Sequence, residues 1–373
     1  MADARVPPRC TPGLCVVGPW FDCDPRGSGS GAIHPIVGVR NLLVVQNRSL
    51  PIHSPIRPAP GPSSSLKPVV AYIGLASLLA WLVHLPVLIM GIGPDDPAYG
   101  LSAQLYAFTP MIAAVICTLA IRNRDMSVLR SLGITPIRPI RQLLGWCAFA
   151  FVIFLVLGFL APLVAGALGV IDLDLAGFSG LREAIIERAP GAADQLSGAG
   201  FPWLAFLIAA ASVIGLSFPL ALPLMIGEEI GWRGFLLPRL MRFGIWPALL
   251  ISGGIHAIWH GPQLLIQYRS GAMGIGALLI FGVGVIAFGV LLGLVRVWSG
   301  SVWPAVIAHA ANNVVAQIGF LTLTAAGSRT DPLWYSGGVG GLIGAGLIMA
   351  FVVGLLQAKV LRDRTATVNG GRA

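Results

Sequence analysis

The chain has 373 residues, of which 56% are hydrophobic and only 10% are charged, and its mean hydropathy is +0.83. Soluble globular domains carry about 25% charged residues, so this composition excludes a soluble domain and indicates a polytopic membrane protein. The net charge of +9 does not indicate a nucleic-acid-binding protein, because the basic residues lie in loops that flank apolar segments, as membrane topology requires.

The N-terminal segment, residues 1–66, is rich in Pro, Gly, Ser and Arg and lacks a sustained apolar period. This composition predicts a disordered or poorly structured extension. The segment also lacks the basic-then-apolar layout of a signal peptide. A misassigned start codon upstream of the true one is the alternative interpretation.

Eight apolar segments follow, and each reaches the length of about 20 residues that a helix needs to cross a bilayer. They cover residues 69–92, 101–121, 143–170, 201–226, 245–267, 274–297, 302–325 and 337–358. The predicted fold class is therefore all-α, a polytopic membrane bundle of about eight transmembrane helices. After the extension we expect three parts: two helices with a basic cytoplasmic loop (67–139), a core (140–325), and a last helix with a basic cytoplasmic tail (326–373).

The charges of the loops predict the orientation of the bundle. With both termini in the cytoplasm, the inner segments contain thirteen Arg and Lys residues, whereas the outer segments contain four. The inner segments are 122–142, 227–244, 296–301 and 358–373, and the outer segments are 93–100, 171–200, 268–273 and 326–336. This asymmetry satisfies the positive-inside rule. We therefore expect a multi-pass protein of the cell (inner) membrane with both termini in the cytoplasm.

Two adjacent carboxylates follow the fourth apolar segment. Between Asp194 and Asp331 the only acidic residues are Glu228 and Glu229. An ionisable group at membrane depth is costly unless it is paired, so it indicates a functional site. Arg233 lies four residues after Glu229, a spacing that favours an ion pair on a helix. Glu228 points about 100° away, so we predict that Glu229 and Arg233 support the site structurally and that Glu228 reacts.

Histidines and an asparagine in later apolar segments supply what a reactive glutamate needs. His256 and His260 are four residues apart, as are His309 and Asn313, and this spacing places each pair on one helix face. A carboxylate and an imidazole can deprotonate a water, and a second imidazole and an amide can stabilise the oxyanion on a scissile carbonyl. If the helices pack together, Glu228, one or both of His256 and His260, His309 and Asn313 can converge on one catalytic site.

Other residues of these segments have structural interpretations. A straight helix over 245–267 would put His260 at a different depth from Glu228, so we expect a tilt, or a break at Gly253-Gly254 or Gly261-Pro262, which membrane proteins tolerate beside a cavity. Gly289 has the small-residue spacing that predicts close helix packing. Arg296 is expected to be an interfacial anchor, and Asn312 to form a local hydrogen bond.

A zinc site is an alternative use of the same polar residues. His256 and His260 have the spacing of helical metal ligands, and Glu228 and His309 could complete a zinc shell. The His-Glu-x-x-His signature of helix-borne zinc proteases does not occur in the chain. A glutamate-activated water needs no cofactor, so the residues alone leave the requirement for Zn²⁺ open.

Three ordered motifs resemble those of the CPBP family of intramembrane proteases, which includes type II CAAX prenyl endopeptidases and bacteriocin-processing or immunity-related membrane proteins. The motifs are Glu228-Glu229-x3-Arg233, His256-x3-His260 followed by Gly-Pro, and His309-x3-Asn313. The resemblance covers the core at 140–325, which we name the CPBP-like intramembrane protease core.

The resemblance implies a role for each matching position. Glu228 and His260 would activate the hydrolytic water, and His309 and Asn313 would form the oxyanion site. The other two residues of the first motif would brace it. One position departs from the family pattern, because the second motif usually opens with phenylalanine and here has His256.

The sequence thus predicts an intramembrane endopeptidase that hydrolyses peptide bonds with a glutamate/histidine-activated water. Its expected partners are membrane lipids and a peptide or membrane-protein substrate, and no nucleic acid. The alternative is a non-catalytic membrane protein, either a bacteriocin immunity or scaffold protein or a transporter, that uses the same polar cluster for binding. Many transporters show paired internal repeats, and this chain has no second copy of the Glu-Glu motif.

Overall fold

The computed structural model describes residues 66–121, 127–135, 137, 139–188, 190–192, 201–336 and 339–370. Residues 1–65, and with them nearly all of the predicted N-terminal extension, lie outside the described residues. Within the described ranges the regular structure is helical, and one isolated antiparallel bridge joins Leu173 to Thr324.

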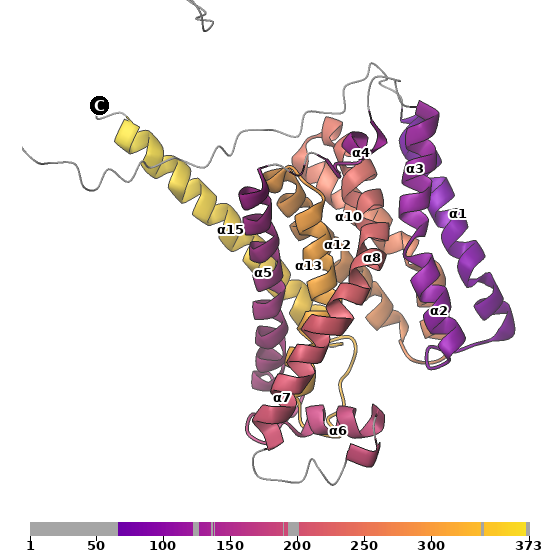
Figure 1. Ribbon diagram of the computed structural model, residues 1–373, viewed down its shortest axis with the longest axis vertical. Coiled ribbons are helices and arrows are strands. Elements are labelled where there is room, and N and C mark those ends of the chain that lie inside the picture. The colour runs from indigo at the N-terminus through magenta and orange to yellow at the C-terminus, as the bar shows by residue number, and fades with distance from the viewer. Residues whose placement is uncertain are drawn as a thin grey trace, which may run out of the picture. The chain divides into compact units, whose positions relative to one another are not determined.

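Seven helical segments among the described residues are long and apolar enough to cross a membrane, judged by length and composition (Figure 1). They are α1 (Lys67–Met90); α2 (Pro97–Tyr106) with α3 (Thr109–Ile121); α5 (Ile140–Ala167); the run Pro202–Phe243; α12 (Ile275–Ser299); α13 (Trp303–Ala310) with the π-helical turn η6 (Ala311–Val315) and α14 (Ala316–Leu323); and Gly341–Ala358 of α15 (Gly341–Gly370). The shorter helices are α4 (Val128–Ser131), α6 (Ser179–Arg188), η1 (Pro190–Ala192), α10 (Ile245–Trp259) and α11 (Gly261–Arg269).

The ends of several helices follow from local sequence. The carboxylate of Asp96 accepts a hydrogen bond from the Ala98 amide at 2.8 Å, and Pro97 occupies the first helical position of α2. Both features favour a helix start. Gly91 and Gly300 end α1 and α12 with φ of 66° and 71°, a left-handed conformation that glycine adopts without steric cost.

The fourth membrane segment is much longer than the sequence predicts. It comprises α7 (Phe201–Ser212), the π-helical turn η3 (Val213–Ser217), α8 (Phe218–Glu229), the π-helical turn η4 (Ile230–Leu236), α9 (Leu237–Leu240) and the 3₁₀ turn η5 (Met241–Phe243). The expected helix end at residue 226 and inner loop at 227–244 are therefore wrong. All seven residues of η4 are buried, so this motif is a core helix and the chain turns only at Gly244.

The fifth predicted segment, 245–267, consists of two helices, α10 and α11, which meet at His260. Pro262 has no backbone N–H and cannot continue the helical hydrogen bonds of α10. Of the two places where a break was expected, Gly261-Pro262 is broken, whereas Gly253-Gly254 lies within α10. The break leaves α10 too short to qualify by itself, which is why seven segments qualify where about eight were predicted, although α10 and α11 together cover residues 245–269.

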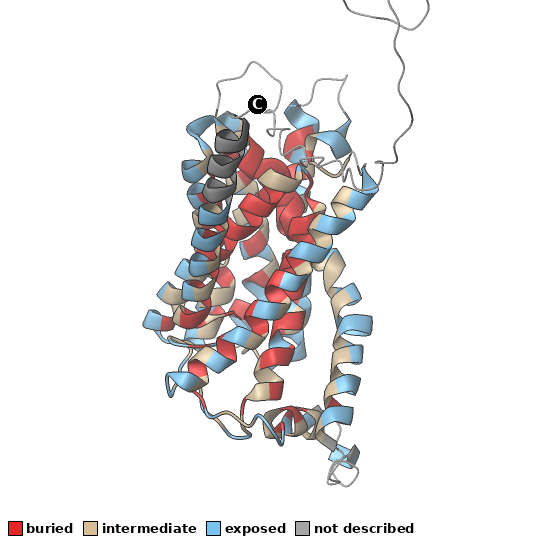
Figure 2. Cartoon of the chain, turned by 90° about the vertical axis from the view of Figure 1, so that its left-hand side faces the viewer, coloured by how far each residue is buried: buried red, intermediate tan, exposed pale blue. Residues whose placement is uncertain are grey.

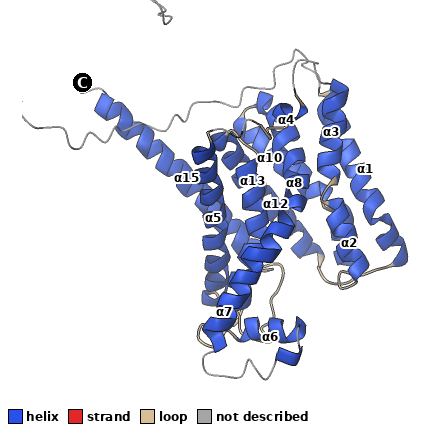
Figure 3. Cartoon of the chain, viewed as in Figure 1, coloured by secondary structure: helices blue, strands red, loops and turns tan. Residues whose placement is uncertain are grey.

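The core of the bundle is built around α12, which packs against α10, α13, α15 and α5. Buried residues gather on these central helices (Figure 2), whereas large apolar side chains such as Ile89 on α1 and Leu207 on α7 are exposed. Such outward apolar side chains suit contact with lipid. The helical composition of the described chain (Figure 3) confirms the predicted all-α, polytopic helical bundle.

Glycines allow α10 and α12 to approach closely. A Cβ placed on Gly289 would lie 2.9 Å from the Cα of Gly253, and one placed on Gly253 would lie 3.1 Å from the backbone of Ile286. Neither position leaves space for a side chain without backbone movement. The predicted packing role of Gly289 is therefore confirmed, and this contact sets how near α10 comes to α12.

We expect Gly289→Ala to destabilise the bundle by about 1–3 kcal/mol, because the added methyl group must push α10 away from α12. The matched control is Gly282→Ala on the same helix, where an added Cβ has nothing within 4 Å. That change should be neutral or stabilise by up to about 1 kcal/mol through helix propensity. Thermal unfolding in detergent measures both, and equal melting temperatures for the two variants would contradict the packing role.

Candidate active site

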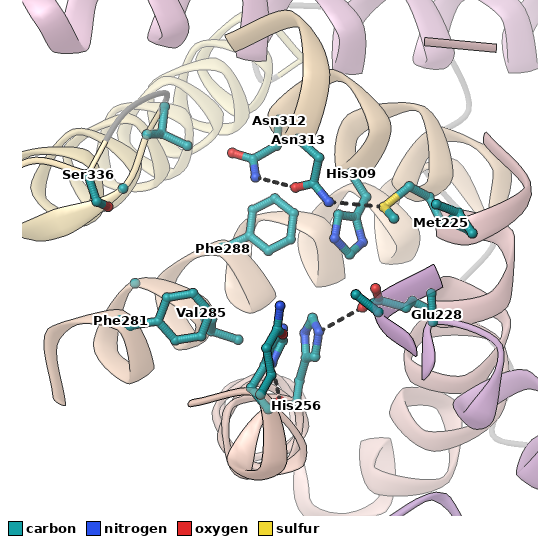
Figure 4. Close-up of a pocket in the computed structure, with 18 of the residues that line it drawn as sticks. Met225, Glu228, His256, Phe281, Val285, Phe288, His309, Asn312, Asn313 and Ser336 are labelled. Carbon is teal, nitrogen blue, oxygen red and sulfur yellow. Dashed lines mark hydrogen bonds and ion pairs between the residues drawn. The ribbon is translucent and has the colours of Figure 1, made fainter. Parts of the chain in front are cut away.

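A cavity of about 490 Å³ lies among α2, α8, α10, α11, α12, α13, η6, α14 and α15. Most of the side chains that line it are apolar or polar without a charge. The lining residues that carry an ionisable side chain are Tyr106, Glu228, His256, His260 and His309. All four candidate catalytic residues line this one cavity, including Asn313 (Figure 4).

The hairpin around Gly244 explains how distant motifs reach the same depth. Gly244 has φ of 91° and joins η5 to α10. Glu228 lies 16 residues before it and His260 lies 16 residues after it. Both arms are helical, so the chain runs back from Gly244, and both side chains line the same cavity, which removes the expected difference in depth.

His256 is the histidine that contacts Glu228. Its Nε2 lies 3.1 Å from Oε2 of Glu228, and both side chains are largely buried, as the dashed line in Figure 4 marks. The imidazole stacks on Trp232 with ring centroids 4.9 Å apart. Its Nδ1 is buried without a hydrogen-bond partner among the described residues. The spacing of the residues left both His256 and His260 as possible partners of Glu228, and the family resemblance implied His260.

His260 lines the cavity with one nitrogen fixed by the backbone. Its Nδ1 donates to the carbonyl of His256 at 3.0 Å, which assigns the proton of the neutral ring to Nδ1 and leaves Nε2 as an acceptor. Phe281 packs edge-on against the ring, with centroids 5.2 Å apart. His260 therefore offers one proton-accepting atom in a largely apolar setting.

Glu229 makes two hydrogen bonds with a single oxygen. Its Oε1 accepts from Nη1 of Arg233 and from Nδ1 of His309, both at 2.8 Å. Nη2 of Arg233 donates to the carbonyl of Gly289 at 3.3 Å. The ion pair indicated by the sequence spacing is present and fully buried, and it also orients His309. Because Nδ1 of His309 is used here, a neutral ring presents an acceptor at Nε2.

The first and the third motif each extend into a π-helical turn. These turns are η4, which follows Glu229, and η6, which follows Ala310. Such turns often occur at functional sites because they alter the hydrogen bonding and the face on which side chains project. The carbonyl of Arg233 within η4 accepts a hydrogen bond from Nε of Arg296 at 3.1 Å. Arg296 is only 5% exposed, so its expected role as an interfacial anchor is wrong.

Asn313 is held by its neighbour. Nδ2 of Asn312 donates to Oδ1 of Asn313 at 2.9 Å, and Nδ2 of Asn313 faces the sulfur of Met225 at 3.3 Å, as seen in Figure 4. A thioether is a weak acceptor. The N–H of the Asn313 amide can therefore be donated to a stronger acceptor that enters the cavity. Asn312 forms the local hydrogen bond that was expected of it.

The polar side chains do not form a ready metal shell. No group of three His, Cys, Asp or Glu side chains within the described part of the chain is arranged to hold a metal ion. Glu228 and His256 bond to each other, so neither side chain can bind a metal without giving up this contact. This arrangement does not fit the zinc alternative, so we derive no step through a metal.

Several cavity residues escaped the sequence reasoning. Tyr106 stacks on Trp259 with centroids 3.7 Å apart, and its hydroxyl donates to the carbonyl of Trp259 at 2.8 Å. That carbonyl lies at the end of α10, where helical partners run out, so Tyr106 stabilises the break beside His260. The cavity is also lined by three glutamines, Gln104, Gln263 and Gln317. In the sequence they can be recognised only as polar side chains within apolar segments.

The fold and site define a polytopic membrane protein with a glutamate–histidine cluster at a cavity between its helices. Residues 201–315 match the family model described as Rce1-like, type II CAAX prenyl endopeptidase Rce1-like. The match contains all three motifs and confirms the resemblance to CPBP proteins. Families of this kind consist of intramembrane proteases. A comparison with curated proteins found no match.

We expect Arg233→Met to destabilise the protein by about 3–5 kcal/mol, because it leaves the Glu229 carboxylate buried without its cation. The double variant Glu229→Gln with Arg233→Met should recover part of this loss, since glutamine removes the charge and still accepts from His309. Thermal unfolding in detergent compares the two proteins. A double variant less stable than the single one would contradict a buried ion pair at this position.

Proposed function

We propose that the protein is an intramembrane endopeptidase that hydrolyses peptide bonds with a water activated by Glu228 and its histidines. The observation that carries this proposal is the contact between Glu228 and His256 on the wall of a cavity that also contains His260, His309 and Asn313. The match of residues 201–315 to an endopeptidase family supports the reaction class. The proposed protease core, 140–325, includes that match.

In the proposed reaction Glu228 removes a proton from a water in the cavity. His256 donates to Oε2 of the carboxylate and so orients it, and Nε2 of His260 offers a second acceptor for the water. The hydroxide forms a bond to the scissile carbonyl carbon. As the carbon–nitrogen bond breaks, the proton held by Glu228 passes to the leaving amine, so the carboxylate is restored.

The negative charge that develops on the oxygen of the scissile carbonyl must be stabilised by a hydrogen-bond donor in the cavity. Nδ2 of Asn313 is a suitable donor, because its present acceptor is only the sulfur of Met225. His309 can add a donor at Nε2 when its ring carries both protons, and Glu229 is then the counter-charge. We therefore assign oxyanion stabilisation to Asn313 with His309, and the bracing of this pair to Glu229 and Arg233.

The identity of the membrane and the orientation of the protein in it are also part of the proposal. Thirteen basic residues in inner segments against four in outer ones support a multi-pass protein of the cell membrane with both termini in the cytoplasm. Arg233 and Arg296 count among the thirteen and are buried in the bundle, so the remaining eleven still outnumber the four. Membrane lipids and a peptide or membrane-protein substrate are the corresponding partners.

Glu228→Gln should lower peptide cleavage by about 10²–10⁴-fold, because the amide cannot accept the proton of the water. The measurement is cleavage of a broad peptide library by purified protein in liposomes, with and without a zinc chelator. The control is Glu187→Gln, an exposed glutamate on α6 outside the cavity, which should retain full activity.

The chelator arm separates the two mechanisms. Cleavage that depends on Glu228 and survives chelation supports the metal-free reaction. Activity that chelation removes and zinc restores would instead make Glu228, His256, His260 and His309 ligands. No cleavage of any library member would favour the alternative of a non-catalytic immunity or scaffold protein or a transporter.

Asn313→Ala should lower kcat by about 10²–10³-fold and leave KM nearly unchanged, because the lost donor acts on the charge that develops in the transition state. Steady-state kinetics with any peptide cleaved by the wild type measure this. A change confined to KM would assign Asn313 to substrate binding and contradict the oxyanion role.

A further inference from the structure

The cavity carries three glutamines on three different helices. Gln104 lies on α2, Gln263 on α11 and Gln317 on α14, and all three line the cavity. None of their side chains forms a hydrogen bond to another residue within the described part of the chain. Gln104 and Gln317 are exposed and Gln263 is half-buried. Each carboxamide is therefore available as both a donor and an acceptor.

The same cavity offers no permanently charged cation for an anionic ligand. No described lining residue is a lysine or an arginine. The cation of the neighbouring motif, Arg233, does not line the cavity and is bound to Glu229 and to the Gly289 carbonyl. A carboxylate that entered the cavity would lie without a fixed positive partner near Glu228. Because burying an unpaired charge is costly, the cavity selects against it.

One wall of the cavity is apolar. Phe281, Val285 and Phe288 lie at positions four and three residues apart on α12, so they share a helix face. Figure 4 shows them on the opposite side of the cavity from Glu228. This wall suits apolar substrate side chains, and the glutamines project from other helices around it.

A peptide bond within a membrane segment is reached only when the segment is extended, because helical hydrogen bonds occupy its N–H and C=O groups. Opening them in an apolar environment costs several kcal/mol per unsatisfied group. A carboxamide repeats the donor and the acceptor of a peptide group. Three free carboxamides around the cavity can therefore replace the hydrogen bonds that an unwound segment loses.

We propose that Gln104, Gln263 and Gln317 form a backbone-binding subsite for an uncharged, apolar, extended stretch inside a longer polypeptide, and that this subsite does not recognise a free C-terminal carboxylate. The inference rests on the proposed function for its reaction, but binding can be measured without cleavage. Substrate recognition is then distributed over α2, α11 and α14, and each glutamine contributes to binding more than to the chemical step.

The test uses a fluorescent peptide built only from Ala, Leu, Val and Gly, and the Glu228→Gln protein in detergent, so that binding is measured without turnover. Each of Gln104→Met, Gln263→Met and Gln317→Met in that protein should raise the Kd of the peptide by about 2–10-fold, the worth of one hydrogen bond. Gln357→Met, an exposed position of α15 outside the cavity, should leave it unchanged.

Two changes in the peptide complete the test and do not depend on the folding of a variant. Amidation of the C-terminus should leave the Kd unchanged, whereas replacement of central backbone amides by esters should raise it. The ester effect should shrink in the glutamine variants, because both changes remove the same hydrogen bonds. Loss of binding on amidation, or equal binding of amide and ester peptides, would overturn the proposal. Cleavage is measured separately with the protein that retains Glu228. The endopeptidase proposal is therefore tested independently of the binding proposal.

Discussion

The carboxylate of Glu229 is the interaction on which the rest of the site depends. It is fully buried, and one oxygen receives hydrogen bonds from Arg233 and His309. Arg233 continues to the carbonyl of Gly289 on α12. A buried charge is tolerated only when its partners are fixed, so this carboxylate links α8 and η4 to α13 and α12. The cavity is formed between the helices that it holds together.

The two neighbouring glutamates serve different purposes because adjacent residues on a helix face different directions. Glu229 points into the bundle, where Arg233 and His309 surround it, whereas Glu228 reaches the cavity and meets His256. One carboxylate orders the protein and the other is left beside the space where a ligand can enter. Glu228 can act as a base only if its carboxylate is not already held in an ion pair, as that of Glu229 is.

Much of the fold follows from sequence pattern alone. Apolar segments of sufficient length predicted the helical bundle, Pro262 predicted the break after α10, and the Glu229–Arg233 spacing indicated an ion pair. The end of the fourth segment was predicted wrongly, because the charges of Glu228, Glu229 and Arg233 suggest the start of a loop, whereas α8 and η4 bury them. Local spacing gives the face of a helix but not its neighbour, so it could not distinguish His256 from His260 as the partner of Glu228.

The hairpin at Gly244 has a consequence for how such a chain can vary. Its two arms bring Glu228, before the turn, into contact with His256, after it. One residue inserted into α10 would rotate everything beyond it by about 100° and lift it by about 1.5 Å. The length of this hairpin is therefore as strictly defined as the identity of its polar residues. The stretch from Glu228 to His260 should therefore tolerate substitutions better than insertions or deletions.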